Sequence, residues 1–285
     1  MTVNLIFIKY PACRRNAEAN HRSVANQTGG LQIRPDGCKS YRSDACDCLN
    51  SSDPQRNEPS SDRMQILSDL SMPFVTACGK IQSAATRDVK SKTPIYLRRT
   101  PGRTFVVKRG YVRLVYAVPD GRLLTRMLLG KGAMFGDLPF RPGFFLPNEQ
   151  AIASGMSCVI EVSRQELENQ AVASPAFESL MLQTFSSQLQ ALDRRMQWQL
   201  IFPLRTRIAT ALYDLVCFSG GRCGHGHLVD VRLTHEEFSE LVVAARPVVS
   251  EILVELKQEG IIDYTRSYLC LLALDRLLSM SAAEH

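Results

Sequence analysis

Nine cysteines and one Cys-Gly-His-Gly-His segment are the residues whose types could bind a metal or respond to redox state. Four thiolates can hold an iron–sulfur cluster, and five cysteines occur before residue 80: Cys13, Cys38, Cys46, Cys48 and Cys78. Their spacing lacks the clustered C-x₂-C pattern, so we expect free thiols or a thiol redox switch and no iron–sulfur cluster. Residues 223–227 could place three metal-capable side chains on one loop. Because a Gly-rich polar loop is expected there anyway, we predict no metal site.

Known catalytic motifs are missing from the sequence. It contains no Walker loop, no G-x-S-x-G and no H-E-x-x-H. The histidines and serines are scattered and give no basis for a catalytic triad. We therefore predict that the protein is not an enzyme.

The composition is that of an ordinary globular protein, with 285 residues of which 45% are hydrophobic and 22% charged. This length suggests two domains. Apolar runs such as 269–274 are far shorter than the roughly 18 residues that a membrane span needs. The apolar run 5–8 precedes the first lysine, which is the reverse of a secretory signal. We expect no membrane partner and a cytoplasmic protein with reduced thiols.

The net charge of +6 is unevenly distributed along the chain. The basic excess lies in residues 64–202, whereas residues 203–285 carry eight basic and 11 acidic side chains. A basic protein can have a nucleic-acid partner, but charge alone does not demonstrate one.

Two stretches of different character precede the middle of the chain. Residues 1–63 are polar and have neither helical nor strand periodicity, so we predict a mostly disordered arm; a translation start assigned too far upstream is the alternative. Short strand-like runs separated by turn signals fill residues 64–174. They lie at 95–97, 104–107, 111–118, 122–129 and 158–162. The loose alternation of 111–118 is typical of a rolled sheet whose outer face is partly buried.

A long helix is predicted over residues 175–202. Apolar residues recur in it at alternating spacings of three and four, the pattern of a seam between two helices. These seam residues are Leu182, Phe185, Leu189, Leu192 and Met196. We predict a dimerisation helix; the alternative is a helix that packs on its own domain.

The C-terminal region, 203–285, has the order of predicted helices and strands that is typical of a winged helix-turn-helix. Thr234 followed by Glu237 predicts a capping box, and a first helix follows. After a break near 243–245, a second helix is expected over about 246–259, with Gly260 as its C′ residue. Two short strands, 261–264 and 268–274, would form the wing.

In its order of elements the chain resembles the Crp/Fnr family of bacterial transcription regulators. The resemblance covers about residues 64–278 and is carried by three stretches. These are Val107-Lys108-Arg109-Gly110-Tyr111-Val112-Arg113 with Phe135-Gly136-Asp137-Leu138, the helix after Pro175 that runs into Arg207-Ile208-Ala209, and Leu233-Thr234 through Ala245-Arg246 to Glu259-Gly260-Ile261-Ile262. It implies an α+β fold: a β-roll sensor domain (a double-stranded β-helix, cyclic-nucleotide-binding-like) over 64–174, a dimerisation helix and a winged helix-turn-helix.

The resemblance also implies how DNA would be read. The second helix of the motif would enter the major groove, where Arg246 could bind guanine O6 and N7; the alternative is contact with phosphate alone. Glu251 could accept from cytosine, while the candidates for phosphate contact are Thr234, His235 and Ser250. The sequence departs from the family at Pro247 and at Val248, which replaces a hydroxyl. It departs again at Val243, where the usual glycine is absent, so that the turn needs either a negative φ or strain.

The effector pocket departs further from the family. Gly136 and Asp137 resemble the pair that meets the ribose of a cyclic nucleotide, and Leu138 and Gln150 complete the candidate pocket. Glu149 stands where the phosphate would lie, and no Arg or Lys occurs between residues 141 and 164. An anion would lack its charged partner there, so we do not expect cyclic AMP to bind in the usual manner. A structural turn is the alternative role for Gly136 and Asp137.

These observations predict a homodimeric, sequence-specific transcription regulator under control of a small-molecule or redox signal. Its partners would be a palindromic double-stranded DNA site and a second copy of itself, with RNA polymerase as a further candidate. One alternative is a sensing or interaction module with degraded DNA readout. Another is a signal-independent regulator with a vestigial effector pocket.

Overall fold

The computed structural model describes most of the chain after residue 71, and all described residues belong to one compact unit. The described ranges are 72–98, 100–118, 121–140, 148–219, 221–224, 226–229, 231–265 and 269–281. The predicted arm, residues 1–63, lies outside them, as do four of the five cysteines that precede residue 80.

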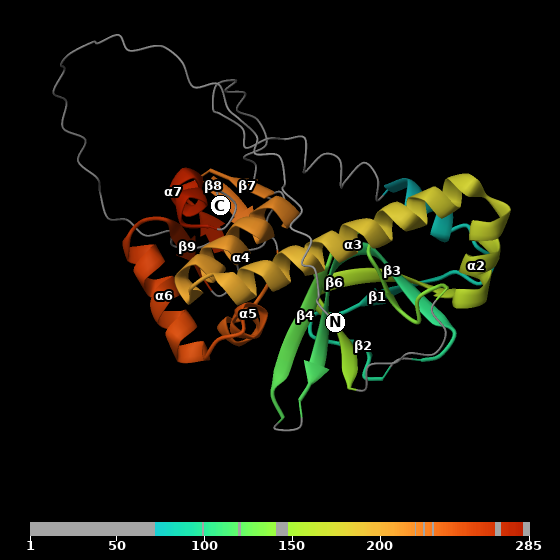
Figure 1. Ribbon diagram of the computed structural model, residues 1–285, viewed down its shortest axis with the longest axis horizontal. Helices are drawn as coiled ribbons and strands as arrows, with labels where there is room; N and C mark the ends of the chain where they lie inside the picture. The colour runs from blue at the N-terminus through green and yellow to red at the C-terminus, as the bar shows by residue number, and fades with distance from the viewer. Residues whose placement is uncertain are drawn as a thin grey trace, which may run out of the picture. The chain divides into compact units, whose positions relative to one another are not determined.

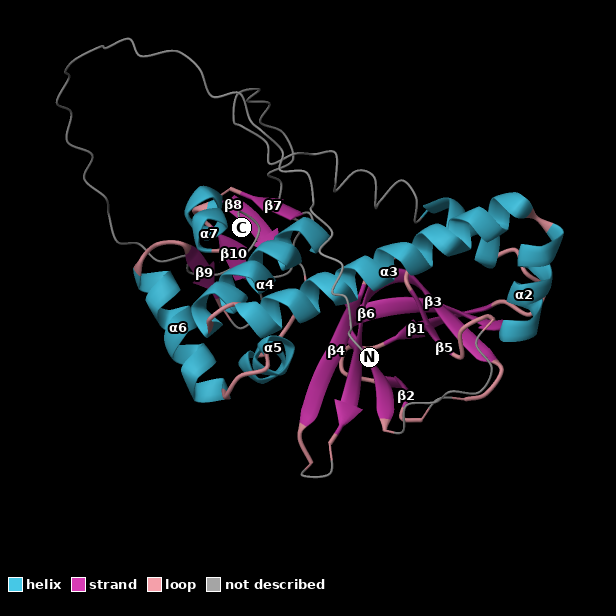
Figure 2. Cartoon of the chain, in the orientation of Figure 1, coloured by secondary structure: helices cyan, strands magenta, loops and turns pink. Residues whose placement is uncertain are grey.

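An antiparallel sheet of six strands forms the first half of the described chain (Figure 2). Its strands are β1 (Ala85–Val89), β2 (Pro94–Tyr96), β3 (Arg103–Ala117), β4 (Leu123–Leu129), β5 (Met134–Gly136) and β6 (Glu149–Ser163). The strand order is β1-β6-β3-β4, while β2 pairs with β6 and β5 with β3. We call this sheet the roll.

The two predicted strands 104–107 and 111–118 are one bent strand, β3. Its register against β6 shifts on both sides of Arg109, and Gly110 has a φ of 77°. A Cβ at Gly110 would lie 2.5 Å from the Met156 carbonyl oxygen, so only glycine allows this close approach. Shifts of this kind bend and twist a long strand, which lets β3 and β6 curl instead of forming a flat ladder.

Two helices follow the roll, α2 (Arg164–Ala173) and the 27-residue α3 (Pro175–Ile201). The predicted start at Pro175 is confirmed: proline occupies the first turn, and the Ser174 side chain accepts from the Phe177 N–H at 3.3 Å. Figure 1 shows α3 running from α2 to α4. It buries Phe177, Met181 and Trp198, which are not members of the predicted seam.

The described residues of the C-terminal region form four helices and a second antiparallel sheet. Its elements are α4 (Leu204–Ser219), β7 (Gly221–Cys223), β8 (Gly226–Val229), α5 (His235–Val242), α6 (Arg246–Gln258), β9 (Ile262–Tyr264), β10 (Leu269–Leu271) and α7 (Leu274–Met280). The strand order is β7-β8-β10-β9. Two expectations were wrong in detail: part of the Gly-rich loop at 223–227 pairs as β7 and β8, and the second wing strand ends at Leu271, after which α7 begins.

Three apolar clusters hold these elements together. Phe105 and Phe135 stack inside the roll with ring centroids 5.3 Å apart. A second cluster joins the helical residues 72–78 to α2 and α3, and a third forms the C-terminal core. The predicted α+β fold is confirmed. None of the helices in the described part of the chain has the length and hydropathy that a bilayer crossing requires.

Candidate nucleic-acid interface

Helix α5 begins with the predicted capping box. The Thr234 hydroxyl accepts from the Glu237 N–H at 3.2 Å, and the Glu237 carboxylate accepts from the Thr234 N–H at 2.8 Å. Each side chain thereby satisfies a backbone donor that the first helical turn leaves without a partner. The start of the helix-turn-helix, which we define as α5, α6 and the residues between them, is therefore fixed by its own sequence.

The turn between α5 and α6 has a positive φ at Val243, which is the strained one of the two conformations expected from the sequence. Val243 has φ 54° and ψ 62°, in the left-handed region. A β-branched residue is rare there because its Cβ approaches the following carbonyl, which costs roughly 1–2 kcal/mol. The neighbouring helices over-determine this conformation, since Leu241 and Val242 are buried on one side and Val249 on the other.

Helix α6 presents its N-terminal residues to solvent. Val249, Leu253 and Leu256 are buried and define the inner face, whereas residues 246–248 and Glu251 are exposed. The Arg246 side chain is 64% exposed, and its Nε lies 3.7 Å from a carboxylate oxygen of Glu236, which is exposed as well. An exposed pair of this kind contributes little stability, so the guanidinium is accessible to a partner.

His235 and Ser250, two of the residues predicted to contact phosphate, are hydrogen-bonded to each other. His235 Nδ1 lies 3.0 Å from the Ser250 hydroxyl, and the imidazole packs edge-on to the Tyr264 ring at 5.4 Å. These contacts join α5, α6 and β9, so both side chains have a structural role in addition to any contact with DNA. The five predicted DNA contacts come together on α5, α6 and the residue that precedes α5.

Sequence reasoning missed two partly buried arginines that hold the C-terminal end of α5. Arg195 on α3 donates to the Leu241 carbonyl at 2.7 Å, and Arg207 on α4 donates to the Val242 carbonyl at 3.1 Å. Positive charge at this end of a helix is favourable because the last carbonyls lack helical partners. Burial lowers the pKa of Arg195 to about 10. In a sequence such arginines look like ordinary surface residues, because only tertiary structure partly covers them and brings them to the carbonyls of α5.

The predicted effector residues of the roll have internal partners. The Asp137 carboxylate accepts from the Gly102 N–H at 2.8 Å and lies 3.6 Å from Arg164 Nε. Gly136 has a φ of 90°, and a Cβ there would lie 2.8 Å from the Arg103 carbonyl oxygen. Leu138 packs on the second apolar cluster. These contacts support the structural-turn interpretation of Gly136 and Asp137.

Glu149 is fully buried beside a partner that sequence reasoning did not find. Its carboxylate accepts from Arg126 Nη1 at 2.7 Å and from the Tyr96 hydroxyl at 2.9 Å. Gln150, the next residue, pairs with Val115 in the sheet. Little in the sequence indicated that Arg126 and Glu149 pair, since they are 23 residues apart and lie on different strands.

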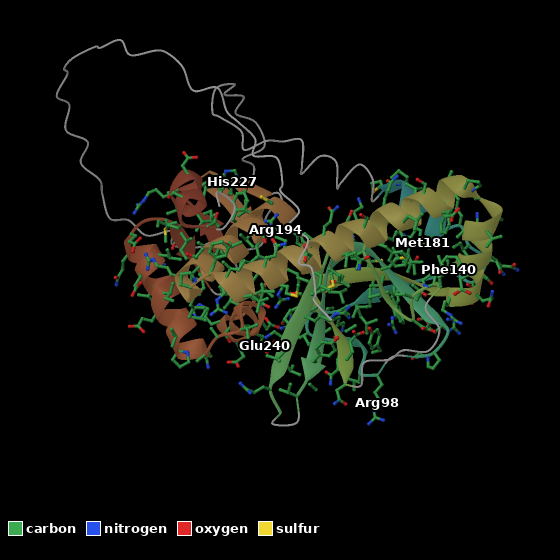
Figure 3. All side chains as sticks on the ribbon, viewed as in Figure 1. Arg98, Phe140, Met181, Arg194, His227 and Glu240 are labelled. Atoms are coloured by element: carbon green, nitrogen blue, oxygen red, sulfur yellow. The ribbon has the colours of Figure 1, made fainter. Side chains whose placement is uncertain are left out.

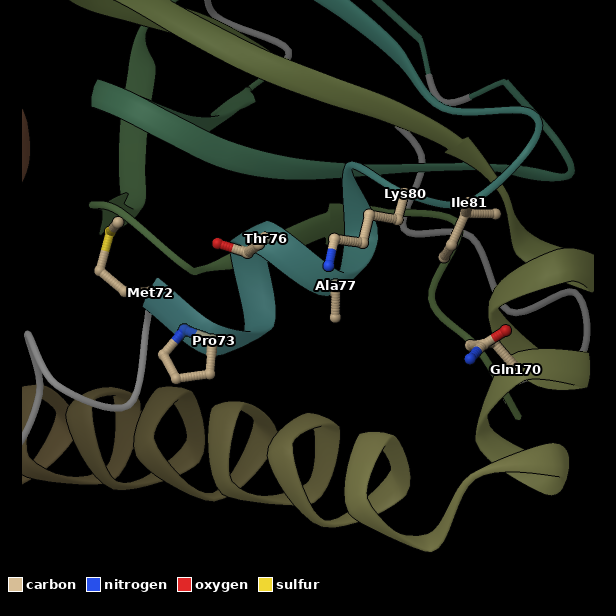
Figure 4. A pocket seen from close by; sticks show the side chains of 7 residues that line it. All are labelled: Met72, Pro73, Thr76, Ala77, Lys80, Ile81 and Gln170. Atoms are coloured by element: carbon tan, nitrogen blue, oxygen red, sulfur yellow. The ribbon is translucent and has the colours of Figure 1, made fainter.

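A cavity of about 440 Å³ lies elsewhere, between residues 72–81 and α2 (Figure 4). Its lining is mainly apolar and consists of Met72, Pro73, Thr76, Ala77, Lys80, Ile81 and Gln170. Gly136, Asp137, Leu138 and Gln150 do not line it.

The predicted seam divides into two sets on α3. Phe185 and Leu192 are partly buried against the chain's own apolar clusters. Leu182, Leu189 and Met196 are 57%, 67% and 52% exposed. Packing on the same chain therefore accounts for two of the five residues and leaves a stripe of three at seven-residue intervals.

Side chains that can bind a metal, and thiols, lie within the ranges that the structure describes. No three His, Cys, Asp or Glu side chains gather there as a metal site would require. The described thiols, Cys78, Cys158, Cys217 and Cys270, are not in disulfides. Burial raises the pKa of Cys78 to about 12 and also raises the pKa of Cys158.

Comparisons with known proteins agree with this architecture. Residues 206–280 match the family model of the Crp-like helix-turn-helix domain. The transcriptional regulator LdrP of Thermus thermophilus is 29% identical over 194 residues, which are 65% of this chain and 92% of LdrP. A CRP-like cAMP-activated global transcriptional regulator of Mycobacterium tuberculosis is 25% identical, over 58% of this chain and 74% of its own.

A solved structure shows the same fold. FixK2 from Bradyrhizobium japonicum matches with a TM-score of 0.61 at 20% identity, over 70% of this chain and 98% of that chain. The matched relatives are named as regulators, in agreement with the prediction of a protein that is not an enzyme. Residues 206–280 therefore form a Crp-like helix-turn-helix DNA-binding domain, and the chain is a transcription regulator similar to those of the Crp/Fnr family.

Proposed function

We propose that two copies of the chain bind a palindromic DNA site through α6, and that a small-molecule or redox signal controls this binding. The observation that carries the proposal is the exposed Arg246 at the first position of a helix whose opposite face is buried. Arginine reads guanine through two parallel hydrogen bonds in the major groove, which are worth about 1–3 kcal/mol of discrimination. A DNA partner implies that the protein works in the cytoplasm.

The exposed stripe on α3 supports the homodimer. Leu182, Leu189 and Met196 recur every seven residues, as in a helix pair, and a second copy of α3 would cover them. A symmetric pair presents two α6 helices, and half-sites about one DNA turn apart, roughly 34 Å, would match them.

Selection of bound duplexes from random DNA tests this function. We expect a short palindrome, with Arg246→Ala weakening the preference at one base pair of each half-site and leaving the other positions unchanged. Lys257→Ala is a matched control, because Lys257 lies on the last turn of α6 and binds Asp263 at 2.7 Å. Failure to select any sequence, or a Leu189→Asp variant that dimerises like the wild type, would contradict the proposal. An empty selection would favour an interaction module without specific readout.

A second candidate, a signal-independent regulator, is favoured by the roll itself. Asp137 and Glu149 both have protein partners, so a ligand would have to displace existing contacts. For the same reason we do not propose cyclic AMP as the effector. DNA affinity measured across metabolites and redox conditions separates the candidates, because a signal-independent regulator binds equally in all of them.

A further inference from the structure

Arg113 is a buried cation on β3 that binds the helix-turn-helix. Its side chain is only 5% exposed, and its guanidinium donates to Glu237 Oε1 at 2.9 Å and to Glu240 Oε2 at 2.7 Å. Both acceptors lie on α5, and Figure 3 labels Glu240 beside the strands of the roll. One positive charge on the roll thus joins two negative charges on the first helix of the motif.

The surroundings of Arg113 make this contact specific. The Thr125 hydroxyl on β4 accepts from Arg113 Nη1 and donates to Glu240 Oε2, both at 3.2 Å. The Glu237 and Glu240 side chains are 13% and 12% exposed. Burial raises the pKa of Glu240, while the charge of Arg113 acts in the opposite direction. Without the arginine, two carboxyl groups would be left nearly buried beside each other, which is costly.

Helix α5 is held to the roll at both ends. Near its start, Glu237 accepts from Arg113 with one oxygen and completes the capping box of Thr234 with the other. At its end, Arg195 bridges the Leu241 carbonyl to the Thr125 and Arg126 carbonyls of β4. Because only residues 243–245 separate the two helices, the direction of α6 follows that of α5.

We propose that Arg113 is a positioning residue for DNA binding: by holding Glu237 and Glu240 it docks the helix-turn-helix on β3 and fixes the direction in which α6 meets DNA. This inference rests on the proposed function. A docked motif has little conformational freedom left to lose on binding, so matching two half-sites costs less than it does for a loose motif. The contact also links β3 and β4 to α6 through α5.

The test compares Arg113→Met, which removes the charge at similar size, with Arg113→Lys, which keeps it. Arg109→Met is the matched control, since Arg109 is on the same strand but is 74% exposed and 3.5 Å from Asp88. Fluorescence anisotropy at several salt concentrations gives the affinity for the selected palindrome and for a random duplex of equal length. We expect Arg113→Met to weaken specific binding at least about tenfold, with Arg113→Lys in between and the control like the wild type.

A positioning role is separated from a merely structural one by the ratio of the two affinities. Partial unfolding lowers the active fraction of the protein and reduces the apparent affinity for both duplexes by the same factor. Misaligned α6 helices reduce only the affinity for the palindrome, because non-specific binding depends on phosphate contacts and counterion release. A wild-type ratio of the two affinities in Arg113→Met would overturn the proposal, whether both affinities are unchanged or both fall by the same factor.

Hydrogen exchange keeps this inference distinct from the DNA-binding function. We expect faster exchange of the α5 amides in Arg113→Met, with the buried α4 amides unchanged. If the wild type selects no DNA, the proposed function fails, while the α5 amides still report docking; unchanged exchange there would refute docking. Should Arg113→Met not fold, Glu240→Gln replaces it, with a roughly threefold weaker specific affinity expected and a wild-type ratio as the contrary result.

Discussion

The candidate effector pocket of the roll and the first turns of α6 use their charged side chains in opposite ways. In the roll, Asp137 and Glu149 stand at positions that suggest a ligand, yet each binds partners inside the chain. In the helix-turn-helix, Arg246 and Glu251 are exposed at the start of a helix. The same residue types therefore stabilise the fold in one region and are accessible to a partner in the other. Burial and partners, not residue type or spacing, decide between the two roles.

The largest effect that this contrast predicts is on the Arg126–Glu149 pair. Arg126→Met leaves the fully buried Glu149 carboxylate without its cation, and we expect a loss of about 3 kcal/mol in unfolding free energy. Chemical denaturation at a fixed protein concentration measures it. The exposed Arg109→Met should change the unfolding free energy by less than about 0.5 kcal/mol.

A double variant identifies the cause of that loss. Arg126→Met with Glu149→Gln removes both charges, so most of the stability should return because no uncompensated charge remains in the roll. If the double variant is as unstable as the single one, packing of the arginine stem accounts for the loss, and the contrast between the regions weakens.

Asp137→Ala is expected to have the next largest effect, and on stability alone. It leaves the Gly102 N–H without its acceptor and removes the contact with Arg164, a loss of about 1–3 kcal/mol. Thermal unfolding should show this loss, while calorimetric titration with cyclic AMP should give no saturable heat in either protein. Tight binding by the wild type that disappears in the variant would give Asp137 the ligand role instead.

Val243→Gly should stabilise the helix-turn-helix, in contrast to the variants of the roll. Glycine adopts a φ of 54° without steric cost, and Val243 is 46% exposed, so little packing is lost. The relief of about 1–2 kcal/mol is partly offset by the greater entropy of an unfolded glycine, which leaves a gain of about 0.5–1 kcal/mol. A melting temperature equal to or below that of the wild type would show that the valine side chain contributes more than its backbone costs.

Local patterns in the sequence predicted the parts of the fold that local physics determines. The Thr234–Glu237 capping box and the helix start at Pro175 each depend on a few neighbouring residues. Contacts between distant segments were not predictable, because strand and helix patterns do not show which arginine will be buried beside which carboxylate. Arg113 is separated from Glu237 by 124 positions, and Arg126 and Glu149 lie on β4 and β6, two strands that each pair with β3.

The smallest expected effect concerns the thiols, and it limits where a redox switch could lie. With a pKa of about 12, roughly one Cys78 thiol in ten thousand is a thiolate at pH 8, so alkylation of the folded protein should leave it unmodified. Cys217, which is partly exposed, should react faster, and mass spectrometry after labelling distinguishes the two; in denaturant both should react. Rapid labelling of Cys78 in the folded protein would show that the core around residues 72–78 opens. An unreactive Cys78 means that any thiol signal reaching α6 must start at another cysteine of the chain.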